Sequence, residues 1–318
     1  MGSKKRKFAD DGWALWIDGD DKSTIYINDW INPKGRSYVD VSVRVYGAKE
    51  TKTVNFFVPF EISDNEITDL SYMLSDSSTL RALFNTNGKV DYKKTKYTSE
   101  LRYDNRNVSL INLTNEFMKV KKLSCGTVIT VDFEFISNFI TSNEAYLIFR
   151  IPHKTLDKIF APVIDVRSVF GRINSLIQSP IISEKYGYSI RINEPRVLPQ
   201  EINEIEVLQE QRIRKTLVTI SIGEEYELND SNCYRIRRLE EELNRNYAPE
   251  GYNCSDAITY LWIDEREFDL NAHYNFYFKM EHHEISKISM FVYLFIVLAT
   301  SALGGAIYDL FKLIFGLI

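Results

Sequence analysis

Alternating apolar and polar positions recur along most of the chain, in runs rich in β-branched and aromatic residues. A period of two in such runs is typical of strands that bury one face. Turn-forming residues, such as those at 32–35 and 87–88, separate the runs. The pattern predicts strands at residues 24–27, 38–46, 53–58, 108–113, 127–135, 145–151, 186–192, 215–222, 257–263 and 274–280.

An acidic turn, Asp18-Gly19-Asp20-Asp21, separates the first two strand-like runs, at 13–17 and 23–27. Clustered carboxylates suit hard cations such as Mg²⁺, but polar residues are also what a tight turn needs. We interpret the segment as the turn of a β-hairpin and predict no metal site there.

Three stretches have the apolar spacing of helices instead, at residues 67–84, 155–178 and 232–246. The third places Ile236 and Leu239 on one side of the predicted helix. The sequence therefore predicts a few helices among many strands.

The stretch 193–210 contains two prolines and many glutamates, which is typical of a linker. We predict an α+β fold, with a β-rich cytosolic domain followed by one C-terminal transmembrane helix. The predicted regions are a β-rich cytosolic domain at 1–195, a smaller α+β membrane-proximal region at 196–285, and the transmembrane helix with its tail at 286–318.

The run from Ile288 to Tyr308 holds 21 residues without a charge. A helix needs ~20 apolar residues to cross the hydrocarbon core of a bilayer. His283 and Lys287 precede the run, whereas Lys312 alone follows it, and the basic N-terminus lacks an apolar signal region. We expect a single-pass protein of the inner cell membrane, with its main domain cytosolic.

Small residues within this run recur at a spacing of four, which lets helices approach one another closely. An acidic and a basic residue follow them three positions apart, where they share a helix face and can pair. The residues predicted to line a pore or to pack helices together are Thr300, Ser301, Gly304, Gly305, Asp309 and Lys312.

Composition narrows the possible functions. The net charge of −5 gives no global attraction to nucleic acid, and the 3 cysteines form no disulfide or zinc pattern. Phosphate-binding loops, dinucleotide-binding motifs, nucleophile elbows and zinc-protease motifs are absent from the sequence. We predict a protein that is not an enzyme and needs no cofactor or metal.

Basic residues gather with aromatic ones in three short segments, beginning near Lys93, Arg212 and Arg235. Arginine forks suit phosphates, and aromatic rings stack on bases; a solvated face paired with nearby glutamates is the alternative. The candidate ligand-binding residues are Arg212, Arg214, Lys215, Arg235, Arg237, Arg238, Lys93, Lys94 and Lys96.

A reduced β-rich domain, no catalytic motif and a small-residue span including Ser301-x-x-x-Gly305 together resemble the transmembrane effectors of bacterial antiviral nucleotide-signalling systems. The Hailong effector is the nearest type, with the membrane effectors of CBASS as looser relatives. The resemblance implies a nucleotide or oligonucleotide ligand, made by a partner nucleotidyltransferase. It also implies a homo-oligomer, with a tetramer as one candidate size, that forms a channel or pore disrupting the inner membrane in antiviral defence.

Two other functions remain open from the sequence. A tail-anchored adaptor or scaffold would use the β-rich domain to recruit a protein partner, with the helix as a passive anchor. A membrane-tethered enzyme of unfamiliar fold would need a site that no motif here provides.

Overall fold

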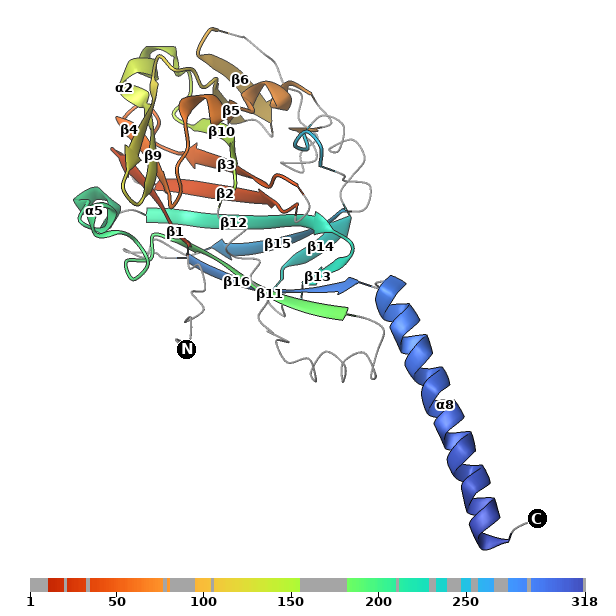
Figure 1. Ribbon diagram of the computed structural model, residues 1–318. Coiled ribbons are helices and arrows are strands. Elements are labelled where there is room, and N and C mark those ends of the chain that lie inside the picture. The colour runs from red at the N-terminus through yellow and green to blue at the C-terminus, as the bar shows by residue number, and fades with distance from the viewer. Residues whose placement is uncertain are drawn as a thin grey trace. The chain divides into compact units, whose positions relative to one another are not determined.

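The computed structural model describes residues 11–19, 22–32, 35–76, 79–80, 95–103, 106–154, 182–209, 212–228, 233–238, 247–252, 257–265, 274–284 and 287–316. Within them, strands dominate and one long helix, α8 (Lys287–Phe315), ends the chain (Figure 1). This confirms the predicted fold class, a β-rich domain followed by one long apolar C-terminal helix.

The described strands form two mixed sheets. The β1 sheet contains, in spatial order, β13 (Tyr226–Leu228), β16 (Tyr274–Glu284), β11 (Ile182–Ile192), β1 (Asp11–Asp18), β4 (Thr53–Val58), β9 (Gly126–Asp132) and β8 (Met118–Leu123). The β2 sheet contains β14 (Arg235–Arg238), β15 (Ala257–Glu265), β12 (Arg212–Gly223), β2 (Lys22–Trp30), β3 (Tyr38–Val45), β10 (Ala145–Pro152), β7 (Arg106–Ile111) and β6 (Thr98–Tyr103), with β5 (Thr68–Asp69) beside β10. Each strand predicted from the two-residue period coincides with an observed one.

Short helical segments connect or cover these strands. They are η1 (Asp64–Glu66), η2 (Ser71–Ser75), α2 (Phe133–Ile136), η3 (Ser137–Phe139), α5 (Gln200–Asn203) and α6 (Glu206–Gln209). Because α2 starts at Phe133, strand β9 ends three residues before the predicted limit of 135.

The two sheets pack face to face through side chains that meet between them. Phe56 of β4 contacts Phe149 of β10 with ring centroids 6.1 Å apart, and Trp262 of β15 contacts Phe278 of β16 at 4.3 Å. Trp13 at 0% exposure is also buried in this core. Edge-to-face and tilted rings of this kind add to the stabilisation from area burial.

The predicted hairpin between residues 13–17 and 23–27 is wrong, although both segments are strands. β1 pairs with β4 and β11, whereas β2 pairs with β3 and β12, so the turn carries the chain from one sheet to the other. Gly19 permits this crossing because its φ is +128° and a Cβ atom there would lie 2.5 Å from the Glu50 carbonyl oxygen.

Two of the predicted helices also need correction. Residues 68–69 form β5, which pairs with Phe149 and Arg150 of β10, and η2 follows it, so the predicted helix over 67–84 is wrong in its first part. Residues 79–80 are helical, and the rest of that prediction, at 77–78 and 81–84, lies outside the described residues. Residues 235–238 form β14, because backbone pairing with β15 outweighs the helical spacing of a short basic segment. The predicted helix at 155–178 lies outside the described residues.

The stretch 193–210 is packed rather than a free linker. Leu198, Ile202 and Leu208 are buried in a cluster with Phe57 and Val128 of the β1 sheet. The apolar positions of this stretch therefore outweigh its prolines and glutamates.

The chain divides into two compact units with bounds that differ from the three predicted regions. The first comprises residues 1–160, 188–224 and 230–278, and the second 161–187, 225–229 and 279–318. In the second unit, β13 pairs with the end of β16, at Tyr226 with His282 and Leu228 with Met280. Strand β16 leads along the chain towards α8.

Strand β8 ends the β1 sheet and carries three lysines, Lys119, Lys121 and Lys122. The segment that follows β4 is held to the adjacent strand β9, where the Thr127 hydroxyl donates to the Phe60 carbonyl at 2.9 Å. Lysine on an edge strand is a common means of discouraging pairing with another sheet.

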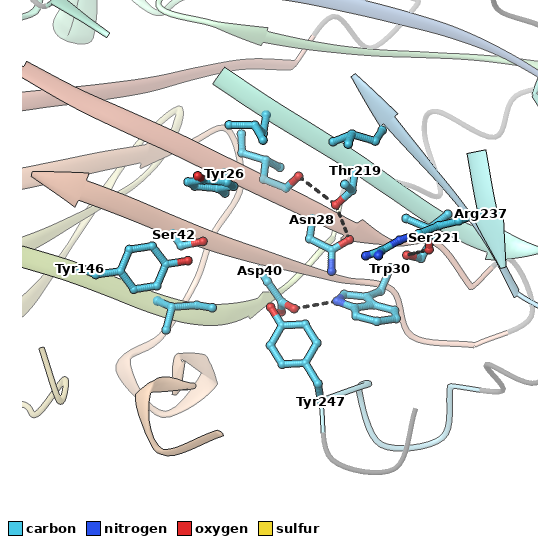
Figure 2. A pocket seen from close by; sticks show the side chains of 15 residues that line it. Tyr26, Asn28, Trp30, Asp40, Ser42, Tyr146, Thr219, Ser221, Arg237 and Tyr247 are labelled. Carbon is cyan, nitrogen blue, oxygen red and sulfur yellow. Dashed lines mark hydrogen bonds between the residues drawn. The ribbon is translucent and has the colours of Figure 1, made fainter. Parts of the chain in front are cut away.

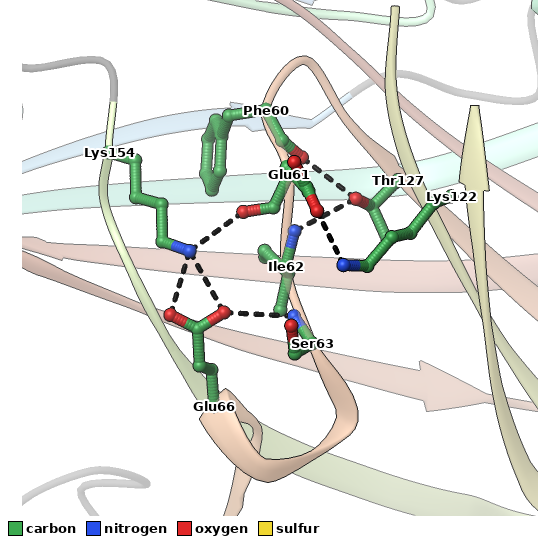
Figure 3. Close-up of polar contacts among 8 residues, drawn as sticks. All are labelled: Phe60, Glu61, Ile62, Ser63, Glu66, Lys122, Thr127 and Lys154. Carbon is green, nitrogen blue, oxygen red and sulfur yellow. Dashed lines mark hydrogen bonds and ion pairs between the residues drawn. The ribbon is translucent and has the colours of Figure 1, made fainter. Parts of the chain in front are cut away.

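Ion pairs hold residues 60–66 against β8 and the end of β10 (Figure 3). The Lys154 ammonium donates to the Glu61 carbonyl at 2.9 Å and to the Glu66 carboxylate at 2.8 Å, while Lys122 pairs with the Glu61 carboxylate. The hydrogen bond from Lys154 lowers the pKa of Glu66, so the pair stays ionised at neutral pH. The contacts of Lys154 fix the position of the chain directly after β10.

Asn193 joins the ends of β11 and β1 through its side chain. It has φ of 54°, a conformation that asparagine tolerates better than most residues. Its amide accepts from the Leu15 backbone N–H at 2.8 Å and donates to the Leu15 carbonyl at 2.9 Å. The side chain thus replaces one backbone partner of the parallel ladder.

Replacing Asn193 with Ala should lower the free energy of unfolding by about 1–3 kcal/mol, because both buried backbone groups of Leu15 lose their partner. Urea denaturation of the purified protein in detergent measures this. Asn143→Ala, at an exposed side chain, is the matched control; equal stability of the two variants would contradict the role of Asn193.

Candidate functional site

A pocket of about 150 Å³ lies on the outer face of the β2 sheet, the face turned away from the β1 sheet (Figure 2). Alternate residues of each strand line it, as the two-residue period of a strand requires. The lining side chains are Tyr26, Asn28, Trp30, Asp40, Ser42, Tyr146, Ile148, Leu217, Thr219, Ser221, Arg237, Tyr247, Thr259 and Leu261, with Ile27 contributing to the floor.

Strand register brings residues from six strands together here. One cross-strand row runs Arg235, Leu261, Thr219, Asn28, Asp40 and Arg150, each opposite the next. A second row runs Arg237, Thr259, Ser221, Trp30 and Tyr38. Neighbouring strands lie about 4.8 Å apart, so side chains along a row are within contact distance.

Aromatic rings form the walls of the pocket. Tyr26 and Tyr146 meet edge to face with centroids 6.5 Å apart, and Trp30 and Tyr247 lie 5.9 Å apart. Trp30, Tyr146 and Tyr247 are buried, and Tyr26 is partly exposed. Walls of this kind accept flat rings by stacking or by edge contacts.

A buried ion pair forms the end of the pocket beneath Trp30. Arg150 donates to both carboxylate oxygens of Asp40, from Nε at 2.6 Å and from Nη2 at 2.8 Å, and Trp30 Nε1 donates at 2.7 Å. The guanidinium also donates to the Tyr247 carbonyl at 2.7 Å and lies 5.8 Å from the Trp30 ring centroid. The Asp40 charge is therefore neutralised by Arg150 and does not repel an anionic ligand.

Burial and the nearby Asp40 carboxylate raise the pKa of Tyr247 well above its ordinary value. The phenol stays neutral throughout the physiological range. It hydrogen-bonds the Asp40 side chain and adds no charge to the pocket.

Amide and hydroxyl groups supply the remaining polarity. Thr219 donates to the Asn28 side-chain carbonyl at 2.7 Å, which orients the Asn28 amide nitrogen toward the Asp40 side of the pocket in Figure 2. Ser221 and Thr259 share a hydrogen bond of 2.9 Å. These groups offer donors and acceptors to the edge of a heteroaromatic ring.

The edge strand β14 adds positive charge to the same face. Arg237 lies opposite Thr259, and Arg235 opposite Leu261, so both side chains project from the pocket face of the sheet. Residues two apart in a strand are separated by about 6.8 Å. Arg237 lines the pocket itself, while Arg235 is exposed further along the strand.

The other predicted basic residues lie elsewhere. Lys215 pairs with Glu265 at 2.9 Å and Arg238 with Glu224 at 3.2 Å, while Lys96 pairs with Glu116 beside Tyr97. Arg214 is exposed on β12, Arg212 begins that strand, and Lys93 and Lys94 lie outside the described residues. Of the predicted ligand-binding residues, the structure brings Arg235 and Arg237 to the pocket face.

Sequence reasoning missed the aromatic and polar lining. The missed signal was on β2, where Tyr26, Asn28 and Trp30 alternate with buried Ile25 and Ile27. Two aromatic residues and an amide on the second face of a buried strand indicate a lined cavity rather than solvent.

Helix α8 carries the second candidate feature, a possible membrane span at Met290–Phe315. Its 29 residues give a length of about 43 Å at 1.5 Å per residue, enough to cross a hydrocarbon core of about 30 Å. None of the span is buried within the chain, which distinguishes it from a core helix. It is the one candidate membrane span among the described residues.

The predicted packing residues occupy one side of α8. Thr300, Ser301, Gly304 and Gly305 fall within an arc of about 140° at 100° per residue. A Cβ atom at either glycine would meet nothing within 4 Å, so this face has room for a neighbouring helix. The Thr300 hydroxyl donates within its own helix to the Ile296 and Val297 carbonyls, both at 2.9 Å.

The predicted pairing of Asp309 with Lys312 is replaced by an aromatic contact. The Lys312 ammonium lies 5.3 Å from the ring centroid of Tyr308. Tyrosine and lysine near a helix end are typical of the membrane interface.

Among the residues that the structure describes, no group of three or more histidine, cysteine, aspartate or glutamate side chains is placed to hold a metal. Asp18 lies at the end of β1, and Asp20 and Asp21 lie outside the described ranges.

No protein-family model and no curated protein match the chain. Among solved structures it is similar to an M1 zinc metallopeptidase from Deinococcus radiodurans, in two crystal structures at 6% and 7% identity with TM-scores of 0.25 and 0.24. The likeness covers 84% of this chain, which spans only 42% of the length of that enzyme. An Fcho1 Mu homology domain from Danio rerio gives 8% identity over 88% of this chain and 81% of that one, with a TM-score of 0.14. Likenesses this low assign neither a family nor an activity.

Replacing Arg150 with Met should cost about 3–5 kcal/mol of unfolding free energy, because Asp40 is left as an uncompensated buried charge. The exposed pair of Arg102 and Glu100 provides the control, since Arg102→Met should cost less than about 1 kcal/mol. Urea denaturation measures both. Similar losses in the two variants would show that the pocket does not depend on the ion pair.

Proposed function

We propose that this chain is a membrane-anchored effector whose β domain binds a nucleotide or oligonucleotide in the outer pocket of the β2 sheet. Ligand binding shifts the assembly of α8 in the inner cell membrane, with the main domain on the cytosolic side. The observation that carries the proposal is the presence in one chain of an aromatic-lined pocket that includes an arginine and an exposed apolar helix long enough to span a bilayer.

The chemistry of the pocket supports a ligand with a flat ring and an anionic group. Trp30 and the tyrosines offer ring contacts, and Asn28 and Thr219 offer hydrogen bonds to a ring edge. Asp40 is neutralised by Arg150, and Arg237 adds a guanidinium to the lining that can donate to phosphate oxygens. A base with an attached phosphate has both parts.

Arg235 extends the same argument beyond one phosphate. Arg235 lies two residues before Arg237 on the pocket face of β14, about 6.8 Å away. An extended chain of phosphates would therefore meet both arginines. This favours a ligand with more than one anionic group, such as a short oligonucleotide made by a partner nucleotidyltransferase.

A single helix cannot enclose water, so a channel requires several copies of α8. The small residues on one face of the helix support close packing between copies, and a cyclic homo-oligomer such as a tetramer is the simplest closed arrangement. Binding energy at the pocket then favours one assembly over another only if the two assemblies bind the ligand differently. An open assembly would permeabilise the membrane, which is a mode of antiviral defence.

Ligand binding is tested by isothermal titration calorimetry with adenosine monophosphate, cyclic nucleotides and short adenine oligonucleotides. Arg237→Gln should weaken binding by about tenfold or more, since it removes a charged hydrogen bond to phosphate. Arg238→Gln is the matched control, because Arg238 lies on the same strand with its side chain on the opposite face. Equal affinity of the two variants would rule out Arg237 as a phosphate contact.

Assembly in the membrane is tested by dye leakage from liposomes carrying the purified protein. Gly305→Leu fills the small-residue face and should reduce leakage by about tenfold, whereas Ala306→Leu adds the same bulk on the opposite side and should change it little. If neither wild-type protein nor any variant releases dye with any of these ligands, the anchored scaffold becomes the better explanation.

A further inference from the structure

Asp29 lies directly behind the pocket. It stands in β2 between Asn28 and Trp30, whose side chains both line the pocket. Because side chains alternate along a strand, the Asp29 carboxylate projects to the other face, into the core between the two sheets. It is 0% exposed there.

Two side chains hold this buried carboxylate. The Tyr188 hydroxyl of β11 donates to Asp29 at 2.5 Å, and His153 Nδ1 lies 3.1 Å from its other oxygen. Tyr188 and His153 are 1% and 5% exposed. A carboxylate buried in an apolar core is costly without such partners, so its position is tightly coupled to theirs.

The contact with Tyr188 crosses from one sheet to the other. Asp29 belongs to the β2 sheet, whereas Tyr188 belongs to β11 of the β1 sheet. The backbone of β2 at this point is paired on both edges, with Val39 of β3 and Ile220 of β12. Strand β2 is therefore held rigidly at this point. A displacement of Asn28 or Trp30 is passed to Asp29 between them, whose side chain is hydrogen-bonded to Tyr188 of the β1 sheet.

We infer that Asp29, His153 and Tyr188 form a relay that reports the state of the pocket to β11. The inference rests on the proposed use of the pocket as a ligand site, and it assigns the regulation of that site. Tyr188 is a positioning residue in this scheme: it touches no ligand and acts through Asp29. A purely structural tyrosine in the same core would stabilise the fold without carrying this signal.

The chain offers such a tyrosine as a control. Tyr274 of β16 is 0% exposed and donates to the Ile213 carbonyl of β12 at 2.7 Å, so it also links the two sheets. Ile213 is not among the residues that line the pocket. Tyr188→Phe and Tyr274→Phe each remove one buried hydroxyl with little change in volume.

Hydrogen exchange of residues 188–192 is the measurement. The pocket is perturbed in two ways, by adding adenosine monophosphate and by the substitution Asn28→Ala, which needs no ligand. Either perturbation should change the exchange rate of this segment by about threefold or more in the otherwise wild-type protein. The response should disappear with Tyr188→Phe and persist with Tyr274→Phe, while residues 119–131 exchange as before.

The outcomes separate this inference from the proposed function. If calorimetry detects no binding of adenosine monophosphate, the ligand assignment is wrong, and the Asn28→Ala comparison alone decides the relay. A response that survives Tyr188→Phe, or no response to Asn28→Ala, overturns the relay even if nucleotides bind. If Asn28→Ala does not fold, Thr219→Val takes its place, since it removes the hydroxyl that orients Asn28 and keeps the side-chain volume; that hydroxyl also lies 3.5 Å from the Ile27 carbonyl oxygen.

Discussion

Coverage of both faces of the β2 sheet is the constraint on which the structure depends. Strands β2, β3 and β10 are buried along nearly their whole length, rather than at every second residue. One face packs against the β1 sheet, and the other is covered where Leu70, just before η2, and Leu74 of η2 join Trp30 and Tyr247 in a single apolar cluster. Polar groups on these strands must therefore find partners inside the protein. Asp40 with Arg150 and Asp29 with Tyr188 satisfy this requirement on opposite faces of the same sheet.

Local pattern carried enough information to locate the strands but not to assign them to sheets. Residues 13–17 form a continuous apolar run and residues 23–27 a β-branched and aromatic one, both typical of strands. Nothing within ten residues of the turn shows that they enter different sheets. That choice depends on distant partners such as Phe57 and Val43. The helical spacing at 235–238 is misleading for the same reason, because the pairing of this segment with residues near 260 decides its conformation.

Only part of the pocket lining could be predicted from the sequence. Basic residues are visible in a sequence, so Arg235 and Arg237 were found, and both lie on the pocket face. Trp30, Asp40 and Tyr247 come from segments far apart in the chain, and only the strand register brings them together. The helix is the opposite case, since its length and lack of charge are local properties. The predicted uncharged run, 288–308, begins two residues before the candidate span Met290–Phe315 and ends seven residues before its end.

The lysines of β8 have a consequence for a protein confined to a surface. A membrane span would hold many copies of the chain in a plane, where collisions between their edges are far more frequent than in free solution. An edge strand without charge would then recruit a neighbouring copy into a growing two-dimensional array of sheets. Lys119 and Lys122 of β8 form ion pairs with Asp132 and Glu61, so a second sheet edge would have to approach a strand whose three lysines are charged and partly engaged. Copies held side by side by such a span would then be kept from pairing edge to edge at β8.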